Sequence, residues 1–374
     1  MKITELTFIV TDDCNYNCSY CFQKKEKKTI SHETIRAAVD FFYPFLDSKH
    51  RIQIGFYGGE PLLAFDKIKY AVLLLLEKNK KGNKDIEFTL TTNGSLLTDE
   101  MIEFFNEHLF ALQLSFDGLA QENGRKKGTI EQTLQVMKQI QSYPNIAFEI
   151  NSVFSPQTVG DFSDSLRFII EHGGPDITYN LSSGEKWRPT DLETLKKEME
   201  RLADYLALYY KKTGRIPVKN FRLSNSKPGI SRCGAGIDHM AVTPEGNLWG
   251  CFLFHDYFKT RKDDPQYRDY FFGTLSDFIA DYKRRYPAIK ANYSELRQDF
   301  YQVEGSDCFL CPEIETCRVC PINAAYETGS LGKISCQKCR LMKIEKGARA
   351  VFVNALGDQE PFRERVPGPP QAFH

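Results

Sequence analysis

The sequence predicts an α/β protein in two parts, a parallel sheet of repeated strand–helix units and a cysteine-rich region after it. First, six apolar strand patterns alternate with amphipathic helix patterns between residues 6 and 181. Second, eight of the eleven cysteines lie after residue 232, several of them in C-x2-C pairs. Repeated strand–helix units form parallel sheets with right-handed crossovers. Cysteine pairs at this spacing inside cells usually bind metal.

The strands and helices of the first half can be assigned in order from their periodicity. The first strand covers residues 6–10, and Ser31 begins the first helix as its N-cap. Further strands are predicted at residues 52–57, 86–91, 112–116, 147–153 and 177–181. The helices that alternate with them are predicted at residues 65–78, 98–105, 129–141 and 162–172.

The second half has fewer regular elements. A charged amphipathic helix is predicted at residues 185–213, and its apolar face is expected to pack on the sheet. Two strands, residues 239–243 and 248–254, flank a hairpin turn of Pro, Glu, Gly and Asn. The apolar spacing after Cys339 predicts a helix that begins at this cysteine.

Composition restricts the class of protein. The 374 residues include 49 basic and 49 acidic side chains, which disfavours nonspecific nucleic-acid binding as the main task. The N-terminus lacks the organisation of a signal peptide. The longest purely apolar run, residues 70–76, is too short to span a membrane. We therefore expect a cytoplasmic protein with reduced thiols and with no nucleic-acid or membrane partner.

Polar residues gather where the predicted strands end. They are Gly58, Gly59, Glu60, Thr92, Asn93, Ser115, Asp117, Asn151 and Ser152. Parallel strands place such ends at one edge of the sheet, where strand–helix loops form ligand sites. Glycines let a ligand approach the backbone, and Glu60 can accept a charge-assisted hydrogen bond from an ammonium group. These residues predict one ligand site beside the loop that follows the first strand.

That first loop carries three cysteines, Cys14, Cys18 and Cys21, at C-x3-C-x2-C spacing. A structural zinc ion takes four protein ligands. A [4Fe–4S] cube is normally held by four cysteines, so three would leave one iron open to another ligand. The alternatives are three buried thiols or part of a zinc site.

The cysteine loop and the strand ends together resemble the radical S-adenosylmethionine (SAM) enzymes over about residues 1–215. The shared features are the cysteine spacing with Tyr20 before Cys21, the Gly58-Gly59-Glu60 segment, and the polar ends of the later strands. The resemblance implies a partial (β/α)6 TIM-like barrel that binds a [4Fe–4S] cluster and SAM. It also implies that the open iron chelates SAM, which is cleaved to a 5′-deoxyadenosyl radical.

The later cysteines resemble the SPASM extension of radical SAM enzymes. They read Cys233-x12-Gly246-x4-Cys251, Cys308-x2-Cys311-x5-Cys317-x2-Cys320 and Cys336-x2-Cys339. The Cys317–Cys320 spacing departs from the family pattern by one residue. A zinc ribbon is the alternative, but one zinc would use only four of these eight cysteines.

The SPASM resemblance implies two auxiliary [4Fe–4S] clusters. Cluster I would be held by Cys233, Cys251 and Cys320, and cluster II by Cys308, Cys311, Cys317 and a terminal cysteine. The terminal ligand is Cys336 or Cys339, and a helix that starts at Cys339 favours the latter. Cluster I then has an open iron, unless Cys336 closes it.

We therefore predict a radical SAM barrel at residues 1–215, a SPASM domain at 216–350 and a C-terminal tail at 351–374, whose proline-rich end from residue 366 is expected to be mobile. The resemblance implies an oxidoreductase that matures a ribosomally made peptide by forming a thioether or C–C crosslink. A sulfatase-maturing, formylglycine-generating enzyme and an enzyme acting on a small molecule are the alternatives. A non-catalytic Fe–S electron carrier would leave the SAM-type motifs unexplained.

Three details bear on these alternatives. Sulfatase maturases carry an acidic residue directly after the second hairpin cysteine, where this chain has Phe252. No catalytic base is assigned, although His255 and Asp256 are near, and residues 125–127 are expected to form a solvated basic loop. The expected partners are a precursor peptide and a flavodoxin- or ferredoxin-type reductant. If the peptide has a leader, we expect either the barrel–SPASM surface or a separate leader-binding protein to recognise it, because the residues before Cys14 leave no room for a winged-helix module.

Overall fold

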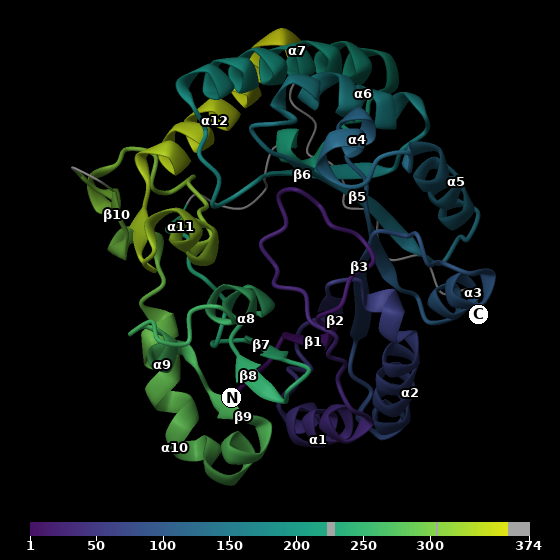
Figure 1. The fold of residues 1–374 in the computed structure, drawn as a ribbon, viewed down its shortest axis with the longest axis vertical. Coiled ribbons are helices and arrows are strands. Elements are labelled where there is room, and N and C mark those ends of the chain that lie inside the picture. Colours follow the sequence, from purple (N-terminus) through teal and green to yellow (C-terminus); the bar gives the residue numbers. More distant parts are fainter. Residues whose placement is uncertain (223–228, 304–305, 358–374) are drawn as a thin grey trace.

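The computed structural model describes residues 1–222, 229–303 and 306–357 (Figure 1). Its main sheet has nine strands in the order β6-β5-β4-β3-β2-β1-β7-β8-β9. The strands from β6 to β1 are parallel and form the predicted open barrel. They are β1 (Glu5–Thr11), β2 (Ile52–Gly58), β3 (Ile86–Thr92), β4 (Ala111–Ser115), β5 (Ala147–Phe154) and β6 (Asp176–Leu181).

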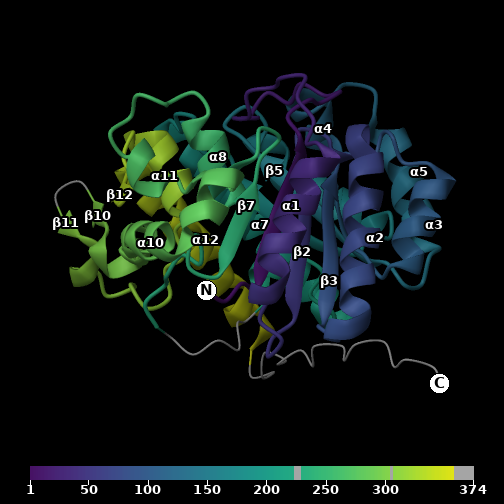
Figure 2. The same cartoon turned by 90° about the horizontal axis from the view of Figure 1, so that it is seen from below.

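Helices follow the barrel strands and cover their outer face (Figure 2). They are α1 (His32–Phe42), α2 (Phe65–Gly82), α3 (Asp99–Glu107), α4 (Gln121–Gly124), α5 (Ile130–Gln141), α6 (Phe162–Glu171) and α7 (Pro189–Thr213). The Ser31 hydroxyl accepts a hydrogen bond from the Thr34 N–H at 3.0 Å, which fixes the start of α1 as predicted. Proline at the first position of α7 and left-handed Gly214 after its last residue delimit that helix.

The cysteine-rich half continues the same sheet. Strand β7 (His239–Val242) pairs in parallel with β1, with Glu5 opposite His239. Strands β8 (Asn247–Trp249) and β9 (Gly273–Thr274) then extend the sheet in antiparallel order. The two halves are therefore joined by backbone hydrogen bonds.

The rest of the second half is helical apart from one small sheet. The helices are α8 (Phe252–Phe258), α9 (Tyr267–Tyr270), α10 (Leu275–Ser294), α11 (Pro321–Thr328) and α12 (Cys336–Leu356). The small sheet has the order β11-β10-β12 and consists of Ser306–Asp307, Gln302–Val303 and Lys333–Ile334. Helix α12 packs beside α7, which brings the end of the described chain back to the barrel (Figure 1).

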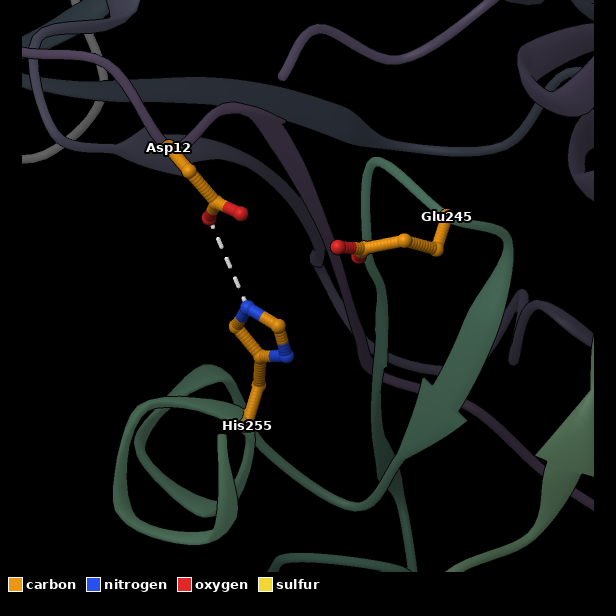
Figure 3. Close-up of side chains that lie close together, drawn as sticks. All are labelled: Asp12, Glu245 and His255. Atoms are coloured by element: carbon orange, nitrogen blue, oxygen red, sulfur yellow. Dashed lines mark hydrogen bonds and ion pairs between the residues drawn. The ribbon is translucent and has the colours of Figure 1, made fainter. Parts of the chain in front are cut away.

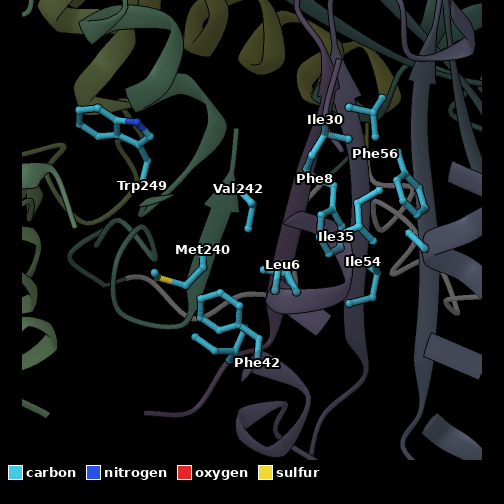
Figure 4. Close-up of a cluster of buried hydrophobic side chains, with 14 of the residues drawn as sticks. Leu6, Phe8, Ile30, Ile35, Phe42, Ile54, Phe56, Met240, Val242 and Trp249 are labelled. Carbon is cyan, nitrogen blue, oxygen red and sulfur yellow. The ribbon is translucent and has the colours of Figure 1, made fainter. Parts of the chain in front are cut away.

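One hydrophobic core extends across the junction of the two halves (Figure 4). It includes Leu6 and Phe8 of β1, Ile54 and Phe56 of β2, and Met240 and Val242 of β7. Central parallel strands are covered on both sides, so near-continuous apolar runs such as that of β1 are expected. The apolar face of α7 contributes Leu195, Met199, Leu202 and Leu206 to a second core cluster, as its spacing predicted.

The structure differs from several sequence-based boundaries. The helix predicted from residue 185 begins only at Pro189, where the Asp191 carboxylate accepts a hydrogen bond from the Arg188 N–H at 2.8 Å. The predicted strand 248–254 is wrong after Trp249, because α8 begins at Phe252. On α8, the side chains of Phe254 and Phe258 are four residues apart and share one buried helical face. Phe258 also stacks on Trp249, with ring centroids 5.3 Å apart. Helix α12 begins three residues before Cys339, because the Ser335 hydroxyl accepts a hydrogen bond from the Lys338 N–H.

The predicted tail boundary at residue 351 falls inside α12, which continues to Leu356. The proline-rich end of the tail lies outside the described residues. Within the described parts of the chain, no helix combines the length and apolar character that a membrane crossing requires.

Candidate functional site

A cavity of about 440 Å³ opens at the C-terminal ends of the barrel strands. Most of the predicted SAM-site residues line it, namely Cys14, Cys18, Cys21, Gly58, Gly59, Glu60, Thr92, Asn93, Ser115 and Asn151. The second half contributes Phe252 and Leu253 of α8 and Asn323 of α11. The cavity therefore touches both halves of the molecule.

The three-cysteine loop leaves the end of β1 and folds over this cavity. Burial raises the pKa of the Cys14 and Cys18 thiols, and the neighbouring thiolate of Cys21 raises it further. Three crowded thiols are poor thiolates unless a positive centre stabilises them, which is what bound iron provides. The donor set therefore fits a cubane cluster with one iron left for another ligand.

Gly58 and Gly59 hold the cysteine loop close to the end of β2. A Cβ atom on Gly58 would lie 2.0 Å from the Thr11 carbonyl oxygen, and one on Gly59 would lie 2.3 Å from that of Asp13. The Gly59 N–H donates to Thr11 O at 3.0 Å, and the Glu60 N–H donates to Asp13 O at 2.8 Å. Only glycine allows this approach, so these residues position the cysteines as well as line the cavity.

Glu60 is buried and fixed by three donors at the strand ends. The Thr92 hydroxyl and the Leu62 N–H donate to Oε1 at 2.6 and 3.1 Å, and the Asn93 N–H donates to Oε2 at 2.8 Å. Burial raises the pKa of Glu60. The carboxyl group is thus held rigidly at the cavity wall, where it can accept a further hydrogen bond from a cationic ligand.

Two of the residues expected to contact SAM, Ser152 and Asp117, do not line the cavity. Ser152 lies on the far face of β5 from Asn151, because successive strand residues point to opposite faces. It is fully buried, and its hydroxyl donates to Phe116 O at 2.6 Å. Asp117 is also fully buried, behind the cavity wall, where its Oδ1 accepts from the Val153 N–H at 2.8 Å. Both residues therefore brace the backbone behind the cavity wall and do not line the cavity.

Arg125 is a site residue that the sequence analysis missed. Its side chain is only 8% exposed, and its Nε lies 2.9 Å from Asp117 Oδ2, which also accepts from the Tyr20 hydroxyl at 2.7 Å. Its Nη2 donates to Asn151 O at 3.2 Å, and the residue lines the cavity. The predicted solvated loop is therefore wrong for Arg125. The polar strand end at Asp117, eight residues earlier in the sequence, was the one available signal.

The later cysteines gather in two groups. Burial raises the pKa of the Cys233 and Cys251 thiols. The neighbouring Cys320 raises both pKa values further, so Cys233, Cys251 and Cys320 form one group. Burial and mutual repulsion likewise raise the pKa of Cys308 and Cys317 within a set formed by Cys308, Cys311, Cys317 and Cys339. Cys336 is the first residue of α12, nearly one turn before Cys339, and stays a candidate ligand.

Asp12, Glu245 and His255 form a polar cluster between the cysteine loop and α8 (Figure 3). His255 Nε2 lies 3.4 Å from Asp12 Oδ1. Both carboxylates also have ammonium partners, because Lys259 lies 2.6 Å from Asp12 Oδ2 and Lys28 lies 2.7 Å from Glu245 Oε1. The cluster is therefore a salt-bridge network that ties α8 and the hairpin turn to the loop after β1.

Comparison with known proteins agrees with this geometry. Residues 8–169 match the model of the radical SAM superfamily. An uncharacterized protein, MJ0907 of Methanocaldococcus jannaschii, is 28% identical over 251 residues, which are 65% of this chain and 82% of that protein. The radical SAM cyclopropyl synthase TigE of Paramaledivibacter caminithermalis is 26% identical over 70% of this chain and 60% of its own length. A serine-type anaerobic sulfatase-maturating enzyme of Bacteroides thetaiotaomicron is 31% identical over 28% of this chain and 27% of its own length.

Solved structures share the fold over most of the chain. Native anSMEcpe with bound AdoMet and Cp18Cys peptide superposes with a TM-score of 0.73 at 18% identity, over 95% of this chain and 99% of that one. Streptococcus suis SuiB bound to precursor peptide SuiA gives a TM-score of 0.56 at 15% identity, over 89% and 75% of the two chains. The similarity includes the cysteine-rich half as well as the barrel.

Proposed function

Because this chain belongs to the radical SAM superfamily, with its radical SAM domain at residues 8–169, we propose that it matures a ribosomally made peptide by forming a thioether or C–C crosslink. The observation that carries this proposal is the shared cavity. Its wall runs from Cys14, Cys18 and Cys21 to Phe252 and Leu253, which directly follow Cys251. A substrate in it would lie between the SAM-cleaving cluster and an auxiliary cluster.

In this proposal Cys14, Cys18 and Cys21 hold the first [4Fe–4S] cluster. With SAM bound, that cluster supplies the 5′-deoxyadenosyl radical. Glu60 accepts a hydrogen bond from the SAM ammonium, and Arg125 offers a charge partner for the SAM carboxylate. Ser115, Asn151, Asn93 and Thr92 provide further polar contacts along the wall.

The two later groups of thiols would hold the auxiliary clusters. Cluster I uses Cys233, Cys251 and Cys320, and cluster II uses Cys308, Cys311, Cys317 and Cys339. Cluster I would lie beside the cavity, because Phe252 and Leu253 line the cavity directly after Cys251. A cluster held there would supply a redox centre, or an open iron for a thiolate ligand, next to the substrate. A flavodoxin- or ferredoxin-type protein supplies the reducing electron.

A peptide substrate is supported by the two structures with related folds, which hold the Cp18Cys peptide and the SuiA precursor peptide. Formylglycine formation is the second candidate, favoured by the partial match to a sulfatase-maturating enzyme. Against it stands Phe252, an aromatic side chain that packs against Tyr57 with ring centroids 4.0 Å apart. Phe252 cannot accept a proton, so a base must come from another residue.

The test is anaerobic co-expression with candidate precursor peptides, followed by intact-mass measurement. Each crosslink should lower the peptide mass by that of two hydrogen atoms. In parallel, purified enzyme is incubated with a sulfatase-derived Cys or Ser peptide and hydrazine, and no trapped aldehyde is expected. Efficient aldehyde formation would overturn the crosslinking proposal and favour the second candidate.

A further inference from the structure

Asp256 is a buried carboxylate directly behind the wall of the cavity. It lies on α8 and is 5% exposed. The Tyr57 hydroxyl donates to its Oδ2 at 3.4 Å, and the Gln23 side-chain amide donates to the same oxygen at 3.2 Å. Tyr57 and Gln23 both line the cavity. The carboxylate is therefore one hydrogen bond away from the space where a substrate would lie.

The surroundings of Asp256 favour a proton acceptor that works near neutral pH. The charged and titratable groups that face it are His255 and Lys259 on its own helix, Asp12 after β1, Tyr57 on β2 and Tyr326 on α11. Burial dominates and raises the pKa of Asp256 to about 6, although His255, Gln23 and Lys259 lower it. A group with a pKa near the working pH can both accept and release a proton efficiently.

We propose that Asp256 and Tyr57 form a proton relay that deprotonates the substrate, an inference that rests on the proposed peptide maturation. The substrate is a peptide with a cysteine thiol at the reacting position. The thiol proton moves to Tyr57 Oη while the Tyr57 proton moves to Asp256 Oδ2. One S–H bond breaks and one O–H bond forms on Asp256, and no electron is transferred. Asp256 acts through Tyr57 and is therefore a positioning residue.

The relay accounts for the base that Phe252 cannot provide. Phe252 is the first residue of α8, and Asp256 lies about one turn further along the same helix. The helix presents an aromatic ring to the cavity at the first position and hides the carboxylate behind Tyr57. A thioether crosslink needs the sulfur without its proton, which this arrangement would supply.

The first test uses the reconstituted holoenzyme without peptide. Isotope-edited infrared spectra of protein with labelled aspartate carboxyl groups are recorded as the pH is raised through 6. A protonated carboxyl band should disappear with a midpoint near 6 in the wild type and be missing from Asp256→Asn. The variant Asp263→Asn, at an exposed position after α8, is the matched control and should retain the band. Persistence of this band in Asp256→Asn would overturn the relay.

The second test measures crosslinked peptide per 5′-deoxyadenosine, using the co-expressed precursor peptide that shows the mass loss. The ratio should fall about a hundredfold in Asp256→Asn and Tyr57→Phe, and it should stay unchanged in Asp263→Asn. The wild-type ratio should rise with pH around 6, whereas that of Asp256→Asn should be flat. If Asp256→Asn shows the same ratio and the same pH profile as the wild type, the relay is wrong but the proposed function stands. Wild-type protein that makes no 5′-deoxyadenosine would defeat the proposed function, and the relay with it.

Discussion

At the scale of single residues, the candidate site depends on buried charged groups that form ion pairs and hydrogen bonds with one another. Arg125, Asp117 and Tyr20 form a connected set in which one carboxylate oxygen serves both the guanidinium and the phenol. A buried charge without a partner would be costly, so these residues are effective only together. The set joins the cysteine loop to the ends of β4 and β5.

Replacing Arg125 should weaken SAM binding without removing the first cluster. Charge-assisted hydrogen bonds contribute about 1.5–3 kcal/mol, so Arg125→Ala should raise the SAM dissociation constant by roughly 10- to 100-fold. Equilibrium dialysis with the reconstituted protein measures this. Lys127→Ala is the control, because Lys127 is exposed and two residues away. Equal affinities for the Arg125→Ala variant and the wild type would contradict the assignment.

Gly59 allows a test of the close approach between β2 and the cysteine loop. In Gly59→Ala the new Cβ would meet Asp13 O at 2.3 Å, so the loop must shift. The expected result is a loss of about four irons per chain, which is the content of the first cluster. Gly160→Ala is the matched control, since a Cβ at Gly160 meets no atom within 4 Å. Full iron content in Gly59→Ala would show that the loop tolerates the displacement.

At the scale of elements, α8 connects the two halves. Its first residue follows Cys251, and its later residues His255, Asp256 and Lys259 contact the loop between β1 and α1. The element that follows Cys251 therefore also restrains the loop that carries Cys14, Cys18 and Cys21. Sequence periodicity could not reveal this role, because the partners are far apart in the chain.

Removing the charge of Lys259 should destabilise this contact. Lys259→Met keeps most of the aliphatic stem but leaves Asp12 buried, with His255 as its remaining partner. Breaking a buried ion pair costs about 3–5 kcal/mol, so the free energy of unfolding should fall by roughly 3 kcal/mol in anaerobic denaturant titrations. Lys262→Met, at an exposed position on the following loop, should change it by less than about 0.5 kcal/mol. A comparable loss in both variants would argue against the salt bridge.

At the scale of the whole molecule, the chain has one continuous framework with separate groups of cysteines placed around it. Strand β7 adds directly to β1, so the predicted division at residue 215 separates chain segments that share a sheet and a core. This arrangement sets the barrel opening beside Phe252 and Leu253, which directly follow Cys251. An auxiliary cluster held by Cys251 would therefore be close to the cavity that the three-cysteine loop lines.

The iron content tests the assignment of all eleven cysteines. Anaerobically reconstituted protein should hold about twelve irons with matching sulfide. Replacing Cys14, Cys18 and Cys21 together with Ala should abolish reductive 5′-deoxyadenosine formation and leave roughly eight irons. Zinc in the purified protein, or only about four irons in the wild type, would contradict the auxiliary clusters. Continued 5′-deoxyadenosine formation by the triple variant would contradict the role of the first loop.

The sequence by itself determined the order of strands and helices in the first half of the chain, the cysteine loop and most of the cavity wall. Residues 52–57, 86–91 and 177–181 lie within β2, β3 and β6 as predicted, because periodicity and turn residues act locally. Strand-end residues such as Glu60 and Asn93 could also be placed, since parallel strands bring their ends to one edge. The alternation of β5 could have assigned Ser152 to the opposite face.

Only the tertiary structure decided the contacts between distant parts of the chain. The pairing of β7 with β1, the burial of Arg125 and the helix in place of a strand after Trp249 depend on neighbours from other elements. Asp256 and Gln23 are 233 positions apart, and no local pattern connects them. Burial, and with it the raised pKa of Asp256, is a property of the packed molecule, because desolvation comes from every element that surrounds a group.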